Sequence, residues 1–238
     1  AYMATVANVD KAVGQMIAFL EKKGLRENTI ILLTSDNGPL RDISHKGLRG
    51  RKSYIFEGGI RVFGTLSWPA VIKAKSSSDI AVGLHDIFPT VCDAAGIPLP
   101  TEKPLDGVSL MPLIKGKTIK RPKDLFWFFY RMSPTAALIR GKYKIVAYSD
   151  DTRQKSHALA QEDMPYIKSA RLVRFEIFDL EKDLQESSDI SQQMPEKLTE
   201  LSKAIIALHD EVIKEGPSWE IPPSSKSGKK AKKRKSSK

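Results

Sequence analysis

The sequence predicts an α/β protein in two parts, a layered α/β domain followed by a small subdomain of short strands and a final helix. Apolar residues recur at helical spacing over residues 2–20, and a continuous apolar run follows at residues 30–33. A helix, a short turn and a continuous apolar strand form one unit of a layered α/β domain. Beyond a proline-rich stretch, residues 126–180 instead show short apolar segments separated by turn residues.

The first domain is predicted to span residues 1–97. Its helix is expected to pack on a sheet, and its strand at 30–33 is expected to be parallel and covered on both faces. Residues 39–57 lack periodicity and are rich in Gly, Arg and Lys, which is typical of a loop over a cleft. A second strand is expected at 60–66, and a helix around 86–95.

A connector is predicted over residues 98–124, and the second subdomain over residues 125–216. The expected strands of this subdomain lie at residues 126–130, 136–140, 143–148 and 172–180. Leu198, Leu201, Ile205, Leu208 and Val212 share one face of a last helix.

The composition indicates a globular chain that can bury a sizeable core, because 41% of its 238 residues are apolar. Its apolar runs are far shorter than the ~20 residues that span a bilayer, so no transmembrane helix is predicted. The one cysteine, Cys92, excludes an internal disulfide and is expected to be a buried helix residue.

The net charge of +11 is concentrated at the C-terminus. Eight Lys or Arg and no acidic residue lie in residues 224–238, which leaves 31 basic and 28 acidic residues in the rest of the chain. Residues 217–238 are predicted to be a disordered basic tail, since they contain too few apolar groups to form a core. The tail is interpreted either as a polyanion-binding segment or as a solubilising end.

Two side chains with oxygen atoms that suit a metal follow the end of the first predicted strand. Residues 34–38 read Thr-Ser-Asp-Asn-Gly and follow that strand directly. Ligands gather beyond the carboxyl ends of strands in open α/β sheets, and adjacent carboxylate and amide oxygens suit Ca²⁺ or Mg²⁺. We therefore interpret Asp36 and Asn37 as half of a metal site. The alternative for an Asp-Asn-Gly sequence is a simple turn.

Basic residues follow this half-site along the chain. Residues 48–52 read Leu-Arg-Gly-Arg-Lys and lead into residues 57–62, Glu-Gly-Gly-Ile-Arg-Val. A lysine near a divalent metal is suited to hold a tetrahedral oxyanion, so Lys52 is a candidate substrate contact. His45 is the one histidine near this loop, and it is a second candidate, as a proton donor to a leaving oxygen.

Together these stretches resemble the sulfatase family, which carries the same Asp-Asn-Gly strand end followed by Leu-Arg-Gly-x-Lys and Glu-Gly-Gly-x-Arg. Residues 85–90 and 178–183 resemble two further elements of the family, so the resemblance covers about residues 1–215. Two positions depart from the family pattern, because Phe63 and Leu184 stand where the family commonly has proline.

The resemblance implies an alkaline-phosphatase-like α/β fold that ends in a small antiparallel sheet packed on a helix. It implies hydrolysis of sulfate esters, with Ca²⁺ at Asp36 and Asn37 and with Lys52 against the sulfate group. It also implies a periplasmic, lysosomal or extracellular location. Aryl sulfates and sulfated polysaccharides are both open as substrates.

The family's nucleophile is a formylglycine made from the first residue of a Cys-x-Pro-x-Arg or Ser-x-Pro-x-Arg motif. Cys92 lacks both the Pro and the Arg, and Ser67-Trp68-Pro69 is followed by Val71 where the Arg would stand. We therefore expect the formylglycine and further metal-binding aspartates upstream, and the chain to be the C-terminal portion of a larger sulfatase or a truncated relative.

Two other functions are compatible with the same residues. A noncatalytic sulfatase-like module would bind sulfated polyanions through Lys52 and the basic tail. A phosphate-ester hydrolase of the same superfamily would share the metal-binding strand end. The sequence of residues 48–61 favours sulfate over phosphate.

Overall fold

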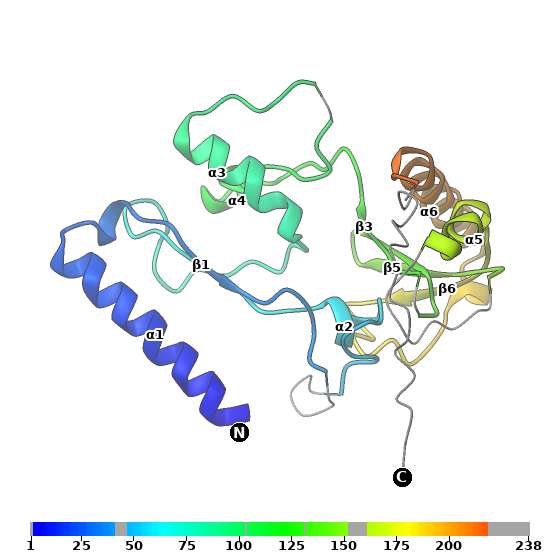
Figure 1. Ribbon diagram of the computed structural model, residues 1–238, viewed down its shortest axis with the longest axis horizontal. Helices are drawn as coiled ribbons and strands as arrows, with labels where there is room; N and C mark the ends of the chain where they lie inside the picture. The colour runs from blue at the N-terminus through cyan, green and yellow to red at the C-terminus, as the bar shows by residue number, and fades with distance from the viewer. Residues whose placement is uncertain (1, 41–46, 103, 131, 152–160, 219–238) are drawn as a thin grey trace, which may run out of the picture.

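The computed structural model describes residues 2–40, 47–102, 104–130, 132–151 and 161–218. Figure 1 shows two parts, one built from α1, β1, β2, α3 and α4 and the other from the sheet β3–β6 with α5 and α6, with α2 between them. His45 and residues 219–238 of the predicted tail lie outside the described residues. In the described part, no helix is both long enough and apolar enough to cross a membrane.

The first part begins with α1 (Tyr2–Lys22), which covers the residues with helical spacing in the sequence. Gly24 has a φ of +67°, and the Leu25 N–H bonds to the Leu20 carbonyl at 2.9 Å, which closes the helix end. The short helix η1 (Arg26–Asn28) leads into β1 (Ile31–Thr34). Strand β1 pairs with β2 (Gly64–Ser67), and Ile31 lies opposite Ser67.

Three expectations for this part are wrong. The β1–β2 pair is antiparallel, and Leu32 and Leu33 are exposed rather than covered on both faces. Helix α1 has no buried residue, because a ribbon of only two strands offers it no broad sheet face to cover. The second strand starts at Gly64 and not at residue 60, since Glu57–Ile60 instead form the helical turn α2.

A helical unit follows the ribbon. It comprises η2 (Leu84–Asp86), α3 (Ile87–Ala95) and α4 (Met111–Ile114), and α3 confirms the helix expected around residues 86–95. The side chain of Thr90 is buried and links α3 to α4, because its hydroxyl accepts the Leu110 N–H at 2.9 Å and donates to the Asp86 carbonyl at 2.6 Å.

The second part is a four-stranded antiparallel sheet in the order β3-β4-β5-β6, which confirms the predicted subdomain. Its strands are β3 (Leu125–Phe128), β4 (Ala136–Arg140), β5 (Tyr143–Ser149) and β6 (Leu172–Asp179). Between β5 and β6 lie η3 (Gln161–Asp163) and α5 (Met164–Ser169), and η4 (Ser191–Gln193) precedes the last helix, α6 (Pro195–Glu215).

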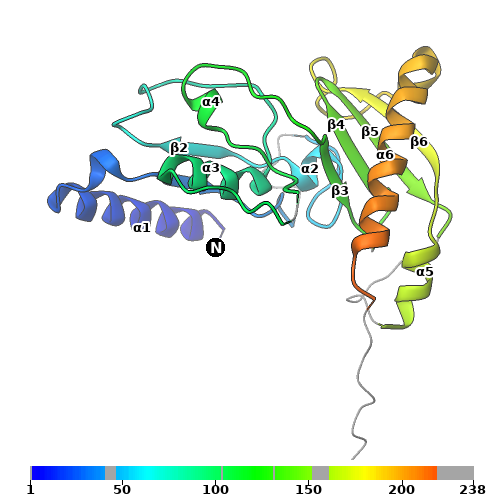
Figure 2. The same cartoon turned by 90° about the horizontal axis from the view of Figure 1, so that it is seen from above.

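Both faces of this sheet are covered. Figure 2 shows α6 running across the sheet, where Leu201 and Ile205 pack on Leu138, Ile145 and other alternate residues of the strands. On the opposite face, the segment before α2 packs on the sheet. A cluster of buried residues forms there from Ile55, Phe56, Ala137, Val146 and Phe178. The strand alternation therefore supplies two cores, and the second of them holds the loop that carries Lys52.

Two neighbouring residues of α6 test the packing on the sheet. Ile205 is fully buried, whereas Ile206 is 36% exposed. We predict that Ile205→Ala lowers the free energy of unfolding by about 2–5 kcal/mol, because it leaves a cavity in the core. Its matched control, Ile206→Ala, should cost less than about 1 kcal/mol. Urea denaturation measures both, and equal losses would show that α6 does not pack as described.

Candidate active site

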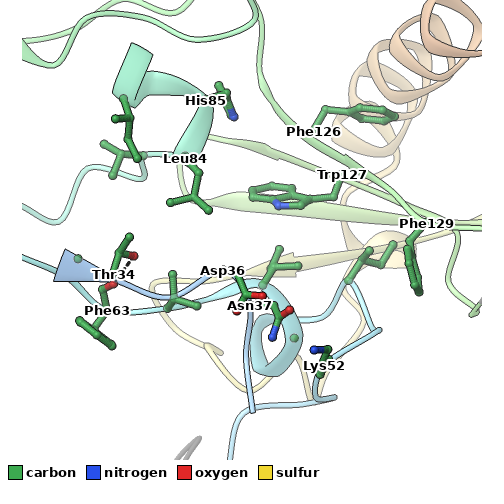
Figure 3. A pocket seen from close by; sticks show the side chains of 18 of the residues that line it. Thr34, Asp36, Asn37, Lys52, Phe63, Leu84, His85, Phe126, Trp127 and Phe129 are labelled. Carbon is green, nitrogen blue, oxygen red and sulfur yellow. Dashed lines mark hydrogen bonds between the residues drawn. The ribbon is translucent and has the colours of Figure 1, made fainter. Parts of the chain in front are cut away.

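The predicted metal-binding and anion-binding residues line one cavity. Asp36, Asn37 and Lys52 all contribute to a cavity of about 620 Å³ between the two parts of the molecule, and Figure 3 shows these three side chains on the same side of it. Asp36 and Asn37 follow β1, while Lys52 belongs to the loop before α2. The fold thus brings together two segments that the sequence alone could connect only through the family resemblance.

Backbone hydrogen bonds hold these segments against each other. The Lys52 N–H donates to the Pro39 carbonyl at 2.8 Å, and the Gly38 N–H donates to the Gly59 carbonyl at 2.8 Å. Gly38 is buried, and a Cβ on it would lie 2.0 Å from the Gly58 carbonyl oxygen. Only glycine allows this approach, so the backbone fixes Asp36 and Asn37 relative to Lys52.

The glycine pair of α2 has a related role. A Cβ on Gly58 would lie 2.4 Å from the Gly50 carbonyl oxygen, and one on Gly59 would lie 1.9 Å from the Tyr54 carbonyl oxygen. These glycines are thus required by close backbone contact and not by a positive φ.

The oxygen atoms after β1 are available to a hard cation. The Asn37 amide nitrogen donates to the Gly38 carbonyl at 2.8 Å, and no described residue donates to its amide oxygen Oδ1. Among the described residues, exposed Asp36 receives only a long 3.5 Å contact from the Ser35 hydroxyl. Carboxylate and amide oxygens fit Ca²⁺ or Mg²⁺. The described residues contain no cluster of three or more His, Cys, Asp or Glu that could hold a metal ion.

Lys52 is exposed at the cavity and, among the described residues, makes no ion pair. Its ammonium group is therefore free to donate to an anion in the cavity. A hydrogen bond between an ammonium group and an anionic oxygen is about twice as strong as one between neutral groups.

A buried cluster of charged groups lies behind the loop. The Lys144 ammonium on β5 is 2.8 Å from Glu57 Oε1 and 2.8 Å from Glu186 Oε1, and none of these three side chains is more than 2% exposed. The Glu57 backbone N–H also donates to Glu186 Oε2 at 2.6 Å. One cation thus joins α2 to β5 and to the segment after β6, and it fixes the start of α2.

Two arginines support this cluster from its exposed side. Arg61 lies 3.3 Å from Glu57 Oε2, while Arg49 donates to the Glu186 carbonyl at 3.1 Å and stacks on the Phe56 ring with its guanidinium carbon 3.9 Å from the ring centroid. The ends of the segment between residues 49 and 61 are therefore both tied to it.

Burial sets the protonation of the cluster. Desolvation raises the pKa of Glu186 above its ordinary value, and it outweighs the attraction of Lys144. Because the folded state then holds the Glu186 proton more tightly than the unfolded state does, the contribution of Glu186 to stability falls as pH rises from its ordinary pKa toward its raised folded pKa.

The opposite wall of the cavity contains His85, which has no partner motif in the sequence. Next to it, Asp86 is fully buried and accepts from Arg121 Nη1 at 2.8 Å and from the Gly83 and Val108 N–H groups at 2.8 and 2.9 Å. Burial alone would raise the pKa of Asp86, but these hydrogen bonds outweigh burial, so the pKa lies below its ordinary value. Asp86 thereby fixes the segment that carries His85.

Comparison with known families shows which family the chain belongs to. A family model described as Sulfatase matches residues 1–97, and one described as N-sulphoglucosamine sulphohydrolase, C-terminal, matches residues 50–213, more than half of the chain. The chain belongs to the sulfatase family. Two sulfatases of Homo sapiens are similar to this chain. Steryl-sulfatase is 40% identical over 139 residues, and arylsulfatase A is 32% identical over 199 residues.

The alignment with steryl-sulfatase covers 54% of this chain and 24% of that protein, and the alignment with arylsulfatase A covers 78% and 38%. This sulfatase chain thus spans about a quarter to two fifths of the length of these relatives.

Solved sulfatase structures confirm the predicted fold class. The PsFucS1 sulfatase from Pseudoalteromonas sp. matches with a TM-score of 0.66 and 26% identity over 90% of this chain and 43% of that chain. A protein solved in complex with its substrate D-glucosamine-2-N,6-O-disulfate matches with a TM-score of 0.67 and 24% identity, over 91% and 41%. The described chain therefore carries part of the α/β fold of the sulfatases together with its antiparallel subdomain.

The buried cation gives a test of how residues 49–61, which we call the sulfatase loop, are held. We predict that Lys144→Met lowers the free energy of unfolding by about 3–5 kcal/mol at pH 7, because it leaves two buried carboxylates without their cation. The loss should shrink at pH 5, where Glu186 with its raised pKa takes up a proton more readily.

The matched control is Lys142→Met, two residues away, where a lysine with a side chain that is 34% exposed pairs with Asp179, and Asp179 also accepts the Glu181 N–H. It should leave the urea midpoint nearly unchanged at both pH values. If Lys144→Met also leaves the midpoint unchanged, the buried cluster does not stabilise the fold.

Proposed function

We propose that this chain supplies the sulfate-binding face and half of the metal site of a sulfatase that hydrolyses sulfate esters. The observation that carries the proposal is that Asp36, Asn37 and Lys52 line a single cavity although they come from two segments. Family membership gives the reaction class, and the free oxygen and ammonium groups give these residues their roles.

The carboxylate of Asp36 and the amide oxygen of Asn37 would hold a divalent cation, Ca²⁺ or Mg²⁺. Such a cation, when bound, withdraws negative charge from the oxygens of a sulfate group. Lys52 donates hydrogen bonds to a sulfate oxygen and compensates its charge, and this contact gains strength as negative charge builds up in the reaction. The hydrogen bond from Asn37 to Gly38 uses the amide nitrogen, so the amide oxygen would be the atom of Asn37 that holds the cation.

The nucleophile and the other metal ligands would come from a segment outside these 238 residues. The sequence contains neither maturation motif, and Cys92 is buried in α3. Apolar side chains on the first part also lack cover, since Met3 and Phe19 on α1 are 74% and 57% exposed. We propose that this surface packs against the rest of the catalytic domain, because exposed apolar patches of this kind mark interfaces.

The names of two relatives refer to sulfate esters with different alcohol parts. Steryl-sulfatase is named for an apolar alcohol, whereas N-acetylgalactosamine-6-sulfatase of Mus musculus, 32% identical over 150 residues, is named for an amino sugar. Both classes are consistent with the roles of Asp36, Asn37 and Lys52, which concern the sulfate group alone. A noncatalytic sulfate-binding module would use Lys52 in the same way but would need no metal.

Binding of a metal at Asp36 separates these functions. Tb³⁺ is a luminescent substitute for Ca²⁺, and Tyr54 and Trp127 in the same cavity would sensitise it. We predict Tb³⁺ luminescence that Ca²⁺ displaces, and an affinity at least about tenfold lower in Asp36→Asn, because that variant loses an anionic ligand.

The control is Asp10→Asn, which removes an exposed carboxylate from α1 and should leave Tb³⁺ binding unchanged. Equal luminescence from the Asp36→Asn variant and the unchanged chain would contradict the metal site.

A further inference from the structure

The cavity has two ends of different chemistry. Asp36, Asn37 and Lys52 form the polar end, and the segments 82–85 and 126–129 form the opposite wall, as Figure 3 shows. The polar end matches the sulfate group of a substrate. The wall faces the place where the alcohol part of the same ester would extend, so its composition bears on which alcohol fits.

The four aromatic residues 126–129 all line this cavity, but they pack on different faces of the sheet. On β3, Phe126 and Phe128 pack with the α6 core, and Phe128 lies edge-on to His209 with ring centroids 4.6 Å apart. Trp127 and Phe129 belong to the opposite face of the sheet, next to the cluster around Phe56. The indole of Trp127 points into the cavity (Figure 3) and is only half-buried, so a ring can lie on it.

The other side of the wall is held in place. Leu84 is 46% exposed and His85 is 37% exposed at its side chain, while adjacent Asp86 is fully buried and anchored by Arg121. A Cβ on Gly83 would lie 2.4 Å from the His85 ring, so the glycine gives that ring its room. Trp127 and Leu84 therefore form a fixed apolar surface rather than a mobile flap.

The wall offers few partners for hydroxyl groups. In segments 82–85 and 126–129, only His85 and Trp127 have polar side-chain atoms. A sugar placed here would bury several hydroxyls without hydrogen bonds, which is unfavourable. A flat apolar ring would instead bury its surface against the Trp127 indole.

We propose that this wall binds the alcohol part of the substrate, and that this part is a flat apolar ring system such as an aryl or polycyclic alcohol. The inference rests on the proposed function, because it takes the sulfate group to lie against Lys52. Trp127 and Leu84 then determine which esters bind, while His85 contacts the ester side of the ring.

Titrations of the chain labelled with ¹⁵N at its three tryptophans test this inference. The probes are 2-naphthyl sulfate, methyl sulfate, 2-naphthol and N-acetylglucosamine 6-sulfate. We expect 2-naphthyl sulfate to shift the Trp127 indole signal and to bind about tenfold more tightly than methyl sulfate or the sugar sulfate. Trp127→Leu should remove this advantage, and Trp68→Phe, outside the cavity, should keep it.

Variants separate the inference from the proposed function. Lys52→Met should weaken both 2-naphthyl sulfate and methyl sulfate but not 2-naphthol. If methyl sulfate depends on Lys52 while the naphthyl ring adds no affinity, the inference is wrong and the proposed function stands. If no sulfate depends on Lys52, both are wrong. Tighter binding of the sugar sulfate than of 2-naphthyl sulfate would overturn the substrate class.

Leu84→Ser gives a second test if Trp127→Leu does not fold. Leu84 is exposed, so its replacement leaves the core intact, and circular dichroism confirms folding. It should weaken 2-naphthyl sulfate several-fold and leave methyl sulfate unchanged. An unchanged affinity for 2-naphthyl sulfate in this variant would contradict the ring-binding wall.

Discussion

The Lys144 ammonium group, buried between Glu57 and Glu186, is the interaction on which the arrangement of the site depends. A buried ion pair gains little net stability, because desolvation offsets the attraction, but removing one member leaves an uncompensated charge. The two carboxylates can therefore occupy only one arrangement, and that arrangement fixes the start of α2. From α2 the constraint passes through the backbone, since Gly38 bonds to Gly59 and Lys52 bonds to Pro39. The small antiparallel sheet is thus a support for the sulfatase loop and not an appendage.

The antiparallel sheet β3–β6 packs against other segments on both of its faces. Its α6 face holds a conventional core, and its other face receives Ile55 and Phe56 from the loop before α2. The same face presents Trp127 at the cavity, so one sheet both fixes the position of Lys52 and forms the opposite wall. The distance between Lys52 and the apolar wall is therefore set by the packing of this sheet. Substitutions in either core would change that distance without touching a ligand.

Local pattern predicted the parts of the fold in which one face is buried. The strands β4, β5 and β6 lie within one residue of their expected places, and α6 contains the five residues expected on one face of the last helix, because alternation and helical spacing report burial directly. The direction and cover of β1 could not be obtained in this way, since an apolar run of four residues fits either a buried parallel strand or an edge of an antiparallel ribbon. The position of Asp36 beside Lys52 followed only from the family resemblance. The buried cluster of Lys144, Glu57 and Glu186 was not predicted, because its members are far apart in the sequence. Glu57 lies 87 residues before Lys144 and 129 residues before Glu186, and a lone lysine in a strand pattern indicates no partner. The place of His85 on the cavity wall was not predicted either, because a histidine without a partner motif does not indicate a site.

Hydrogen exchange at single amides gives the most direct test of the claim that the buried cation holds the sulfatase loop. The amides of Gly38 and Lys52 bond the sulfatase loop to the segment after β1, the amide of Gly58 bonds to Arg49 within the loop, and the ion pairs of Lys144 involve none of these groups. In Lys144→Met, measured where the protein remains folded, these three amides should lose protection while the amides of β5 and β6 keep most of theirs. Lys142→Met should leave all of them protected. Retained protection at Gly38, Lys52 and Gly58 in Lys144→Met, or a uniform loss across the sheet, would contradict the account.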